Sequence, residues 1–228
     1  LVTNEYGLIK IDNQIFLVKN HGPKMVNDLG GKKAIWKSEG FDHTAGPKFK
    51  QTEAFLNGEI PLFYYTFTPA RFFAGIGSRE THAKILLLMT KIAQAFRGLG
   101  YILRSGGAKG ADSAFENGAG SLKDIYLASD STSEALKLAE KHHPGWKYCS
   151  EYVRKLHARN GQILLGRDLD IPVEFVICWT KDGKDLGGTA QALRIARDRG
   201  IKIYNLAFQE HYLDLREYFK FLKYSLDK

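Results

Sequence analysis

The sequence predicts an α/β fold: a doubly wound, mostly parallel sheet of the Rossmann-like type, preceded by a small β-rich or irregular appendage. From residue 71 onward, short apolar runs alternate with amphipathic helical stretches, joined by short connections that contain glycine. Before residue 71 the chain instead shows short apolar runs between closely spaced Gly and Pro residues. We therefore expect two parts, residues 1–70 and residues 71–228.

The composition is that of a folded chain with no membrane segment. Of the 228 residues, 44% are hydrophobic and 12% aromatic, more than a disordered chain contains. The two cysteines, Cys149 and Cys178, form no CxxC pattern, so neither a zinc ribbon nor a disulfide framework is indicated. The apolar run Ile85–Met89 is far shorter than the roughly 20 residues that span a bilayer. We expect a cytoplasmic protein in a reducing compartment.

The net charge of +8 is unevenly distributed. The first 70 residues contain 8 basic and 7 acidic side chains, whereas the remainder contains 25 and 18. A basic surplus favours polyanionic partners through electrostatics that ignore sequence. The second part of the chain is therefore where an anionic ligand is expected.

Within the appendage, residues 6–18 alternate apolar and polar side chains in two runs, broken by Asp12 and Asn13. This pattern predicts a β-hairpin. The frequent breakers in the following residues, up to residue 65, favour short strands and loops over long helices.

The first half of the second part contains three predicted strands. Residues 72–76 form a short apolar run, residues 83–96 have helical periodicity, and Gly98 and Gly100 end that helix. A second strand at residues 101–104 leads through the glycine-rich segment SGGAKGAD into a helix that runs through Phe115. The third strand is expected at residues 124–128.

The second half continues the alternation. We expect helices at residues 131–143 and 150–164, because a Ser-Thr-Ser-Glu start signal precedes the first and Pro144-Gly145 ends it. The continuous apolar run at residues 173–179 is typical of a strand covered on both faces. A helix at residues 189–199, a strand at 201–206 and an amphipathic helix at 213–226 complete the chain.

Three glycine-bearing loops follow predicted strands: Gly75–Arg79, Ser105–Asp112 and Leu186–Thr189. In doubly wound sheets, ligands bind outside the carboxyl ends of the strands, where backbone N–H groups at helix N-termini hold anions. One such loop alone commonly serves only a tight turn, but three at matching positions favour a phosphate-binding crevice. The chain has no GxxxxGK[ST] motif and no GxGxxG motif followed by an acidic residue, so neither a P-loop nor an NAD site is predicted.

Four segments in this order make the chain resemble the DprA/Smf family: FAGIGSRET, LRSGGAKGADSAFENGA, ARNGQILLG and GGTAQALRIARDRGIKIYNL. They span residues 73–206. That family belongs, with the LOG nucleotide phosphoribohydrolases, to the SLOG superfamily of nucleotide- or DNA-binding proteins. A compact member of this layout resembles those found in bacteriophage genomes.

The resemblance implies binding of single-stranded DNA or nucleotide phosphates over the strand ends, without a metal or another cofactor. At the position where the family usually has His, four residues after the loop Asp112, this chain has Glu116, and the family's flanking domains have no counterpart. The motifs and loops together give the following binding residues: Gly77, Ser78, Arg79, Ser105, Gly106, Gly107, Lys109, Gly110, Asp112, Arg159, Asn160, Gly187, Gly188 and Thr189.

The alternative is a nucleotide N-glycosidase similar to the LOG enzymes. Their GGxGTxxE motif is matched by Gly188-Thr189, but Ala192 stands in place of the motif's Glu. Asp112, Glu116 and Arg159 are the weak catalytic candidates, because the two carboxylates share one helix face at i,i+4 spacing. The competing interpretation is that Asp112 caps its helix and Glu116 is a surface residue. The sequence leaves open whether a reaction is catalysed.

Other polar and aromatic residues have simpler explanations. His142 and His143 end a helix, where a cation complements the helix dipole, and His157 has no second ligand at metal-binding spacing, so no metal site is predicted. Trp179 ends a buried strand, where it would either stack on a base or pack in the core. Cys178 is expected to be an inert buried thiol. Homo-oligomer formation is left open.

Overall fold

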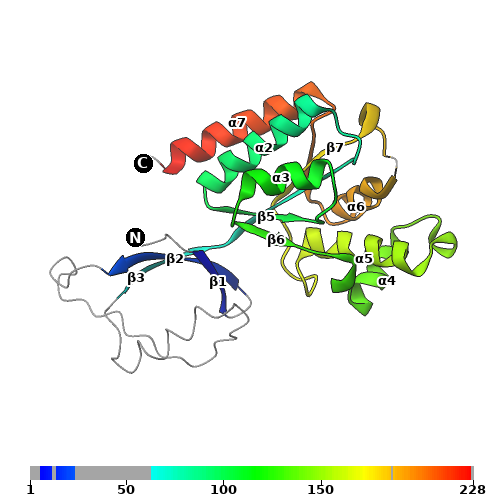
Figure 1. Cartoon of the computed structure of the whole chain (residues 1–228), viewed down its shortest axis with the longest axis horizontal. Helices are drawn as coiled ribbons and strands as arrows, with labels where there is room; N and C mark the ends of the chain where they lie inside the picture. The colour runs from blue at the N-terminus through cyan, green and yellow to red at the C-terminus, as the bar shows by residue number, and fades with distance from the viewer. Residues whose placement is uncertain (1–5, 12–13, 24–62, 186, 227–228) are drawn as a thin grey trace. The chain divides into compact units, whose positions relative to one another are not determined.

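The computed structural model describes residues 6–11, 14–23, 63–185 and 187–226. The chain divides into two units, Leu1–Ala70 and Arg71–Lys228 (Figure 1). Each unit has its own sheet, antiparallel in the first and parallel in the second.

The first unit contains β1 (Tyr6–Ile11), β2 (Gln14–Pro23) and β3 (Phe63–Pro69) in the order β1-β2-β3. The predicted hairpin is present, since β1 and β2 pair antiparallel as far as Ile11 opposite Gln14. Asp12 and Asn13 lie outside the described residues, as do residues 24–62, for which loops and short strands are expected.

The second unit is built on a five-stranded sheet in which every pair of neighbours is parallel. The order is β6-β5-β4-β7-β8, so the chain leaves β4 toward one edge and later returns to its other side through β7. The strands are β4 (Arg71–Gly77), β5 (Tyr101–Ser105), β6 (Lys123–Ile125), β7 (Phe175–Trp179) and β8 (Lys202–Asn205). The reversal creates a crevice site between β4 and β7.

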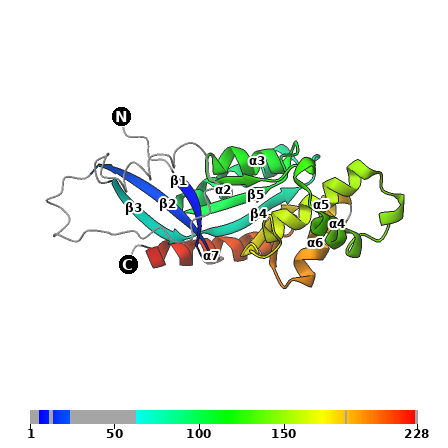
Figure 2. The same ribbon diagram turned by 90° about the horizontal axis from the view of Figure 1, so that it is seen from below.

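Six helices flank this sheet among the described residues. They are α2 (Ala83–Gly98), α3 (Ala111–Ala119), α4 (Ser133–Lys141), α5 (Glu151–Leu165), α6 (Gly187–Asp198) and α7 (Gln209–Leu226). In Figure 1, α2, α3 and α7 lie on one side of the sheet, and α4, α5 and α6 lie on the other. Figure 2 shows α4, α5 and α6 grouped together. The predicted α/β doubly wound class is confirmed.

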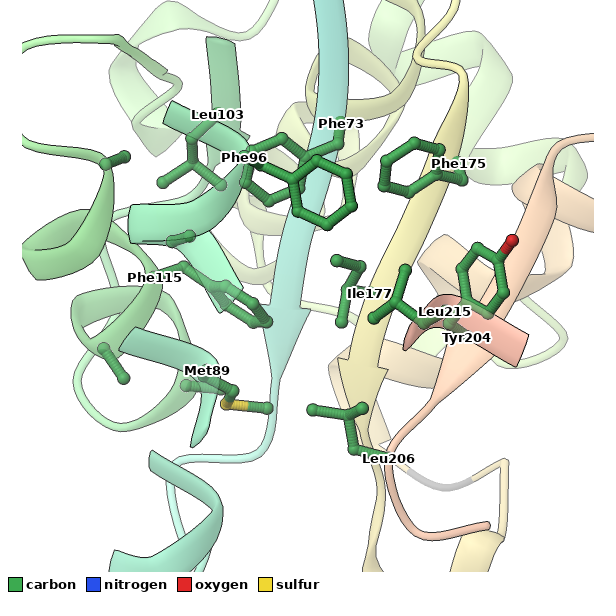
Figure 3. Close-up of a cluster of buried hydrophobic side chains, with 14 of the residues drawn as sticks. Phe73, Met89, Phe96, Leu103, Phe115, Phe175, Ile177, Tyr204, Leu206 and Leu215 are labelled. Carbon is green, nitrogen blue, oxygen red and sulfur yellow. The ribbon is translucent and has the colours of Figure 1, made fainter. Parts of the chain in front are cut away.

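The main core lies between the sheet and the α2, α3 and α7 layer. Phe73 in β4 is fully buried, stacks on Phe175 of β7 at 6.0 Å between ring centroids, and meets Phe96 of α2 at 5.4 Å (Figure 3). In α2, Met89, Ala93 and Phe96 are buried at the i, i+4, i+7 spacing that the sequence shows. This apolar layer holds the strand ends that carry the loops in fixed positions.

Several predicted boundaries are wrong, among them the end of α3, which is at Ala119 rather than Phe115. The strand expected at residues 124–128 ends at Ile125, because Leu127 N–H donates to the Asp130 carboxylate at 2.7 Å and the chain turns into a short 3-10 segment. The helix expected at residues 131–143 spans only Ser133–Lys141, because Thr132 caps it and its hydroxyl accepts from Ala135 N–H. The last helix begins at Gln209, four residues before the predicted start. None of the described helices is both long and apolar enough to cross a membrane.

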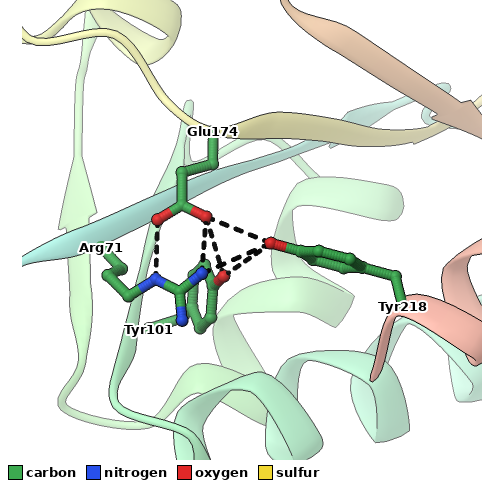
Figure 4. A network of polar contacts seen from close by, with 4 residues as sticks. All are labelled: Arg71, Tyr101, Glu174 and Tyr218. Carbon is green, nitrogen blue, oxygen red and sulfur yellow. Dashed lines mark hydrogen bonds and ion pairs between the residues drawn. The ribbon is translucent and has the colours of Figure 1, made fainter. Parts of the chain in front are cut away.

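A closed polar network joins the starts of the strands to α7 (Figure 4). Arg71 forms a two-pronged pair with the Glu174 carboxylate at 2.8 and 2.9 Å, and the hydroxyls of Tyr101 and Tyr218 also donate to that carboxylate, at 2.8 and 3.3 Å. Burial raises the pKa of Glu174, but the bonds from Arg71 and Tyr101 outweigh it, so the net pKa is below its ordinary value. Both charged residues of this network, Arg71 and Glu174, therefore have a partner.

Candidate functional site

A cleft of about 830 Å³ lies where β4 and β7 end. Its lining comes from the loop after β4, the start of α3, one face of α5 and the segment from Thr180 through α6. This is the position at which doubly wound sheets bind ligands, and the volume suits a ligand of nucleotide size.

Backbone hydrogen bonds hold the first two loops side by side. Ser78 N–H donates to Trp179 O at 3.3 Å, and Ala111 N–H donates to Ser78 O at 3.3 Å. Gly110, the N-cap of α3, has φ +84°, and a Cβ there would lie 2.8 Å from the Arg79 carbonyl oxygen. Only glycine satisfies both the backbone angle and this close approach.

Nine of the fourteen predicted binding residues line the cleft. They are Gly77, Ser78, Arg79, Asp112, Arg159, Asn160, Gly187, Gly188 and Thr189. The first turn of α6 contains no acidic residue, so no carboxylate there repels an anion. Leu186, which precedes this helix, lies outside the described residues.

The other five predicted residues do not line the cleft. Ser105 is fully buried and donates its hydroxyl to Gly75 O at 2.7 Å, which is a structural role. Gly106 is buried against the Arg159 guanidinium, with which any side chain at this position would collide. The remaining three are Gly107, Lys109 and Gly110.

Lys109 was expected to meet a phosphate, but its side chain is exposed and does not line the cleft. It sits in the turn just before α3, and the turn directs only Ala108 and Asp112 to the lining. Glu116, the weak catalytic candidate, also does not line the cleft and pairs with Lys123 at 3.1 Å. Of the two carboxylates at i,i+4 spacing, only Asp112 therefore lines the cleft, whereas Glu116 forms an ion pair outside it.

Arg159 is the central cation of the cleft. It extends from α5, its residue is 8% exposed, and its Nε has no hydrogen-bond partner among the described residues. No carboxylate of the described residues lies within ion-pair distance of its guanidinium. Burial, with a further contribution from the charge of Arg79, lowers its pKa below the ordinary value, opposed by Asp112. Next to it, Asn160 donates to Gly188 O at 3.3 Å and to Gln191 Oε1 at 2.8 Å, which ties α5 to the start of α6.

Asp112 is the one buried carboxylate of the cleft among the described residues, at 4% exposure. The interpretation that it caps α3 is wrong, because Gly110 is the cap and the Asp112 carboxylate accepts from Ala108 N–H at 3.2 Å. Burial raises its pKa to about 6, although Arg159 and the Ala108 N–H act in the opposite direction. A carboxyl group that titrates near pH 6 is suited to proton transfer.

Sequence reasoning missed several lining residues. Among them are three residues that follow β7: Thr180, Lys181 and Lys184. The two lysines in the loop KDGKDLGG are the sequence signal that could have pointed to this segment. Arg194 is not among the predicted binding residues, but it lines the cleft and donates from Nε to His142 O at 2.8 Å. It lies four residues after Ala190, which also lines the cleft, so the two side chains share one face of α6.

The lining is positive overall. Its cations are Arg79, Arg159, Lys181, Lys184 and Arg194, and its carboxylates are Glu80, Asp112 and Asp185. One of these carboxylates, Asp185, is already paired with Arg197 outside the lining. The arrangement therefore favours an anionic ligand.

Trp179 and Cys178 are both core residues. Trp179 is 7% exposed, packs edge-on against His82 at 5.5 Å and does not line the cleft, so the base-stacking alternative is wrong. Cys178 is fully buried, and burial raises its pKa to about 12, which confirms an inert thiol.

His143 and His157 line one side of the cleft, and Cys149 lies beside them. Ligand atoms of the three side chains lie within 4.8 Å of one another. The expectation that His157 has no second ligand is wrong, because its neighbours come from the turn between α4 and α5 rather than from its own helix. Burial lowers the pKa of His157 to about 4, with help from the charges of His143, Arg194 and Arg159 and opposed by the side chain of Gln191.

Fold and site together define the second unit as a Rossmann-like α/β domain with a cationic cleft at its topological switch point. No protein-family model matches the chain, and neither a curated protein nor a solved structure does.

Proposed function

We propose that the cleft binds nucleotide phosphate groups, presented either by single-stranded DNA or by a free nucleotide, as the resemblance to the DprA/Smf family implies. The observation that carries the proposal is the convergence of three glycine-bearing loops with Arg79 and Arg159 on one cleft. Glycine lets a phosphate approach backbone N–H groups, and a guanidinium binds it through two parallel hydrogen bonds.

Arg159 supports the proposal most directly. A buried guanidinium is costly unless it is paired, and the described residues supply no carboxylate at ion-pair distance. A phosphate in the cleft would provide the missing charge and hydrogen-bond acceptors. Gly106 is then explained as well, because it leaves room for this side chain.

The test is a pair of charge reversals, Arg79→Glu and Lys109→Glu. Both side chains are exposed, but only Arg79 lines the cleft. Binding of inorganic phosphate and of a nucleoside monophosphate, measured by calorimetry, should fall at least about tenfold in Arg79→Glu and change little in Lys109→Glu. Equal effects of the two reversals, or no binding by the unaltered protein, would overturn the proposal.

Salt dependence separates a free nucleotide from a DNA strand. The affinity for a labelled oligothymidylate, measured by fluorescence anisotropy, should fall with salt at a slope of roughly 0.7 per phosphate contacted. A slope corresponding to several phosphates, together with weaker binding by Lys109→Glu, indicates a strand that extends beyond the cleft. A slope near that of the mononucleotide indicates a free nucleotide.

A second candidate function, N-glycosidic cleavage of a nucleotide, is favoured by the buried Asp112 carboxyl beside Arg159. When protonated, this group can donate its proton to the departing base; water adds to the sugar carbon and returns a proton to the carboxylate. The LOG motif would place its Glu at Ala192, which does line the cleft, so Asp112 takes over as the carboxyl group. Release of free base from a nucleoside monophosphate should be lost in Asp112→Asn and retained in Glu116→Gln.

We also place the protein in the reducing environment of the cytoplasm. Both cysteines are free thiols, which is the usual state of cysteine in that compartment. Labelling of the native protein in cell extract, with and without reductant, would detect any disulfide that contradicts this placement.

A further inference from the structure

We propose that His143, Cys149 and His157 form a binding site for a zinc-class transition-metal ion, with two imidazole nitrogens and one thiolate as ligands. The proposal depends only on the donor atoms of these three side chains and not on the residues proposed to bind phosphate. Phosphate binding can therefore fail without affecting it.

The turn between α4 and α5 brings the first two ligands together. Backbone bonds close this turn: Trp146 N–H donates to His143 O at 3.2 Å, and Cys149 N–H donates to Trp146 O at 3.0 Å. Cys149 Sγ consequently lies 3.8 Å from Nδ1 and 3.9 Å from Nε2 of His143. The pairing of a thiol with an imidazole is thus built into a hydrogen-bonded turn, not an open loop.

The third ligand comes from the buried face of α5. His157 is 8% exposed, and its ring lies 4.3 Å from that of His143 between centroids. Its Nδ1 is buried and has no hydrogen-bond partner among the described residues. A buried ring nitrogen without a partner is a rare arrangement in a protein. A metal ion would supply the missing partner.

The distances suit a tetrahedral ion after a small contraction. Zinc bonds to thiolate at about 2.3 Å and to imidazole at about 2.0 to 2.1 Å, which places tetrahedral ligand atoms about 3.3 to 3.6 Å apart. Here the ligand atoms lie within 4.8 Å of one another, and the sulfur already lies 3.8 Å from a His143 nitrogen. Gly145 N–H donates to His143 Nδ1 at 3.2 Å, a bond that a metal at this nitrogen would replace.

The donor set selects the class of metal. Two imidazoles and a thiolate suit zinc, copper or cobalt, and not magnesium or calcium, which prefer oxygen ligands. Three protein ligands leave one position of a tetrahedral ion for water or another small ligand. His143 and His157 also line the cleft, so the cluster lies at the cleft wall.

The test uses the whole protein stripped of metal with a chelator and then titrated with Co²⁺ and Zn²⁺. We expect one equivalent of Co²⁺ to give the thiolate charge-transfer band and the intense visible bands of a four-coordinate site. Cys149→Ser should remove the charge-transfer band, although Cys178 remains. Both Cys149→Ser and His157→Ala should weaken Zn²⁺ binding by more than about 100-fold, since loss of an outer-shell partner alone costs 10- to 100-fold.

His82→Ala is the matched control, because this exposed histidine lies outside the cluster and should leave binding unchanged. A second measurement needs no substitution. Cys149 is partly exposed and Cys178 is buried, so thiol alkylation of the native protein reports on Cys149. One equivalent of Zn²⁺ should slow that alkylation at least about tenfold. An unchanged alkylation rate, or Co²⁺ spectra without a thiolate band, would overturn the proposal.

Discussion

Two ends of the same parallel sheet hold an arginine in opposite ways. At the start of β4, Arg71 makes a two-pronged pair with the Glu174 carboxylate, and two tyrosine hydroxyls also donate hydrogen bonds to that carboxylate. At the other end of the strands, Arg159 is more deeply buried, yet its Nε has no partner among the described residues. Burial lowers the pKa of Arg159, and the charge of Asp112 is the main effect that raises it. The pKa of Asp112 is itself raised to about 6.

The difference separates a structural from a functional use of the same residue type. The Arg71 network joins α7 to the strand starts and satisfies each of its members, so its contribution is to stability. At Arg159, the described residues provide no carboxylate at ion-pair distance, and the nearby Asp112 carboxyl is buried in surroundings that raise its pKa. Such sites lower the stability of the folded state and are typical of ligand-binding positions.

The largest expected effect is on Asp112. Burial raises its pKa from 3.8 to about 6, so between about pH 4 and pH 6 the folded chain holds a proton that the unfolded chain has lost. Stability from this group is therefore present below pH 4 and is lost as pH rises through 6. Asp112→Asn keeps an acceptor for Ala108 N–H and should raise the free energy of unfolding at pH 7 by about 2 to 3 kcal/mol.

Urea denaturation of the unaltered protein and of Asp112→Asn, from pH 4 to pH 7.5, measures the free energy of unfolding of each. The difference between the two proteins isolates Asp112 from every other titrating group. It should be close to zero at pH 4 and grow until pH 6 to 7. A difference that stays constant with pH would show that Asp112 has an ordinary pKa and that the two ends of the sheet are electrostatically alike.

The next effect compares Arg71→Met with Arg159→Met. Arg71→Met removes the cation from the Glu174 network and should lower the free energy of unfolding by about 1 to 2 kcal/mol, reduced from the value for a buried pair because both partners are about a third exposed. Arg159→Met removes an unpaired buried charge and keeps an apolar stem, so stability should be unchanged or higher.

Ligand binding should show the reverse order. Arg159→Met should weaken binding of inorganic phosphate roughly 10- to 100-fold by calorimetry, because a hydrogen bond to a charged group contributes roughly 1.5 to 3 kcal/mol. Arg71→Met should leave it unchanged. If both substitutions destabilised the fold equally, Arg159 would be a structural residue like Arg71.

The smallest effect on stability is expected at the start of α6. A Cβ at Gly188 meets nothing within 4 Å, so Gly188→Ala should change stability by less than about 0.5 kcal/mol while weakening phosphate binding, since the added methyl group blocks the approach to the backbone. Gly106→Ala is the contrast: its Cβ collides with the Arg159 guanidinium and should cost about 1 to 3 kcal/mol. Unchanged phosphate binding by Gly188→Ala would remove α6 from the site.

Periodicity predicted the strands and helices of the second unit because it depends on which side chains are buried, and the sheet is buried on both faces. The continuous apolar run before Trp179 became β7, and Met89, Ala93 and Phe96 occupy the buried face of α2 as their spacing indicates. Boundaries were less predictable where one side-chain bond decides them, as at Asp130.

The sequence by itself determined the doubly wound sheet, the three glycine-bearing loops after its strands and nine of the residues that line the cleft. It did so because the alternation of apolar strands with amphipathic helices, and the positions of the glycines, can be read from short stretches of sequence. Parallel strands then bring their carboxyl ends to one edge of the sheet. The tertiary structure alone decided that Lys109 points away, that Arg194 faces the cleft, that Asp112 is buried and that Cys149 meets two histidines. Each of these depends on how turns and helices pack in three dimensions, which the pattern of apolar and polar residues does not record.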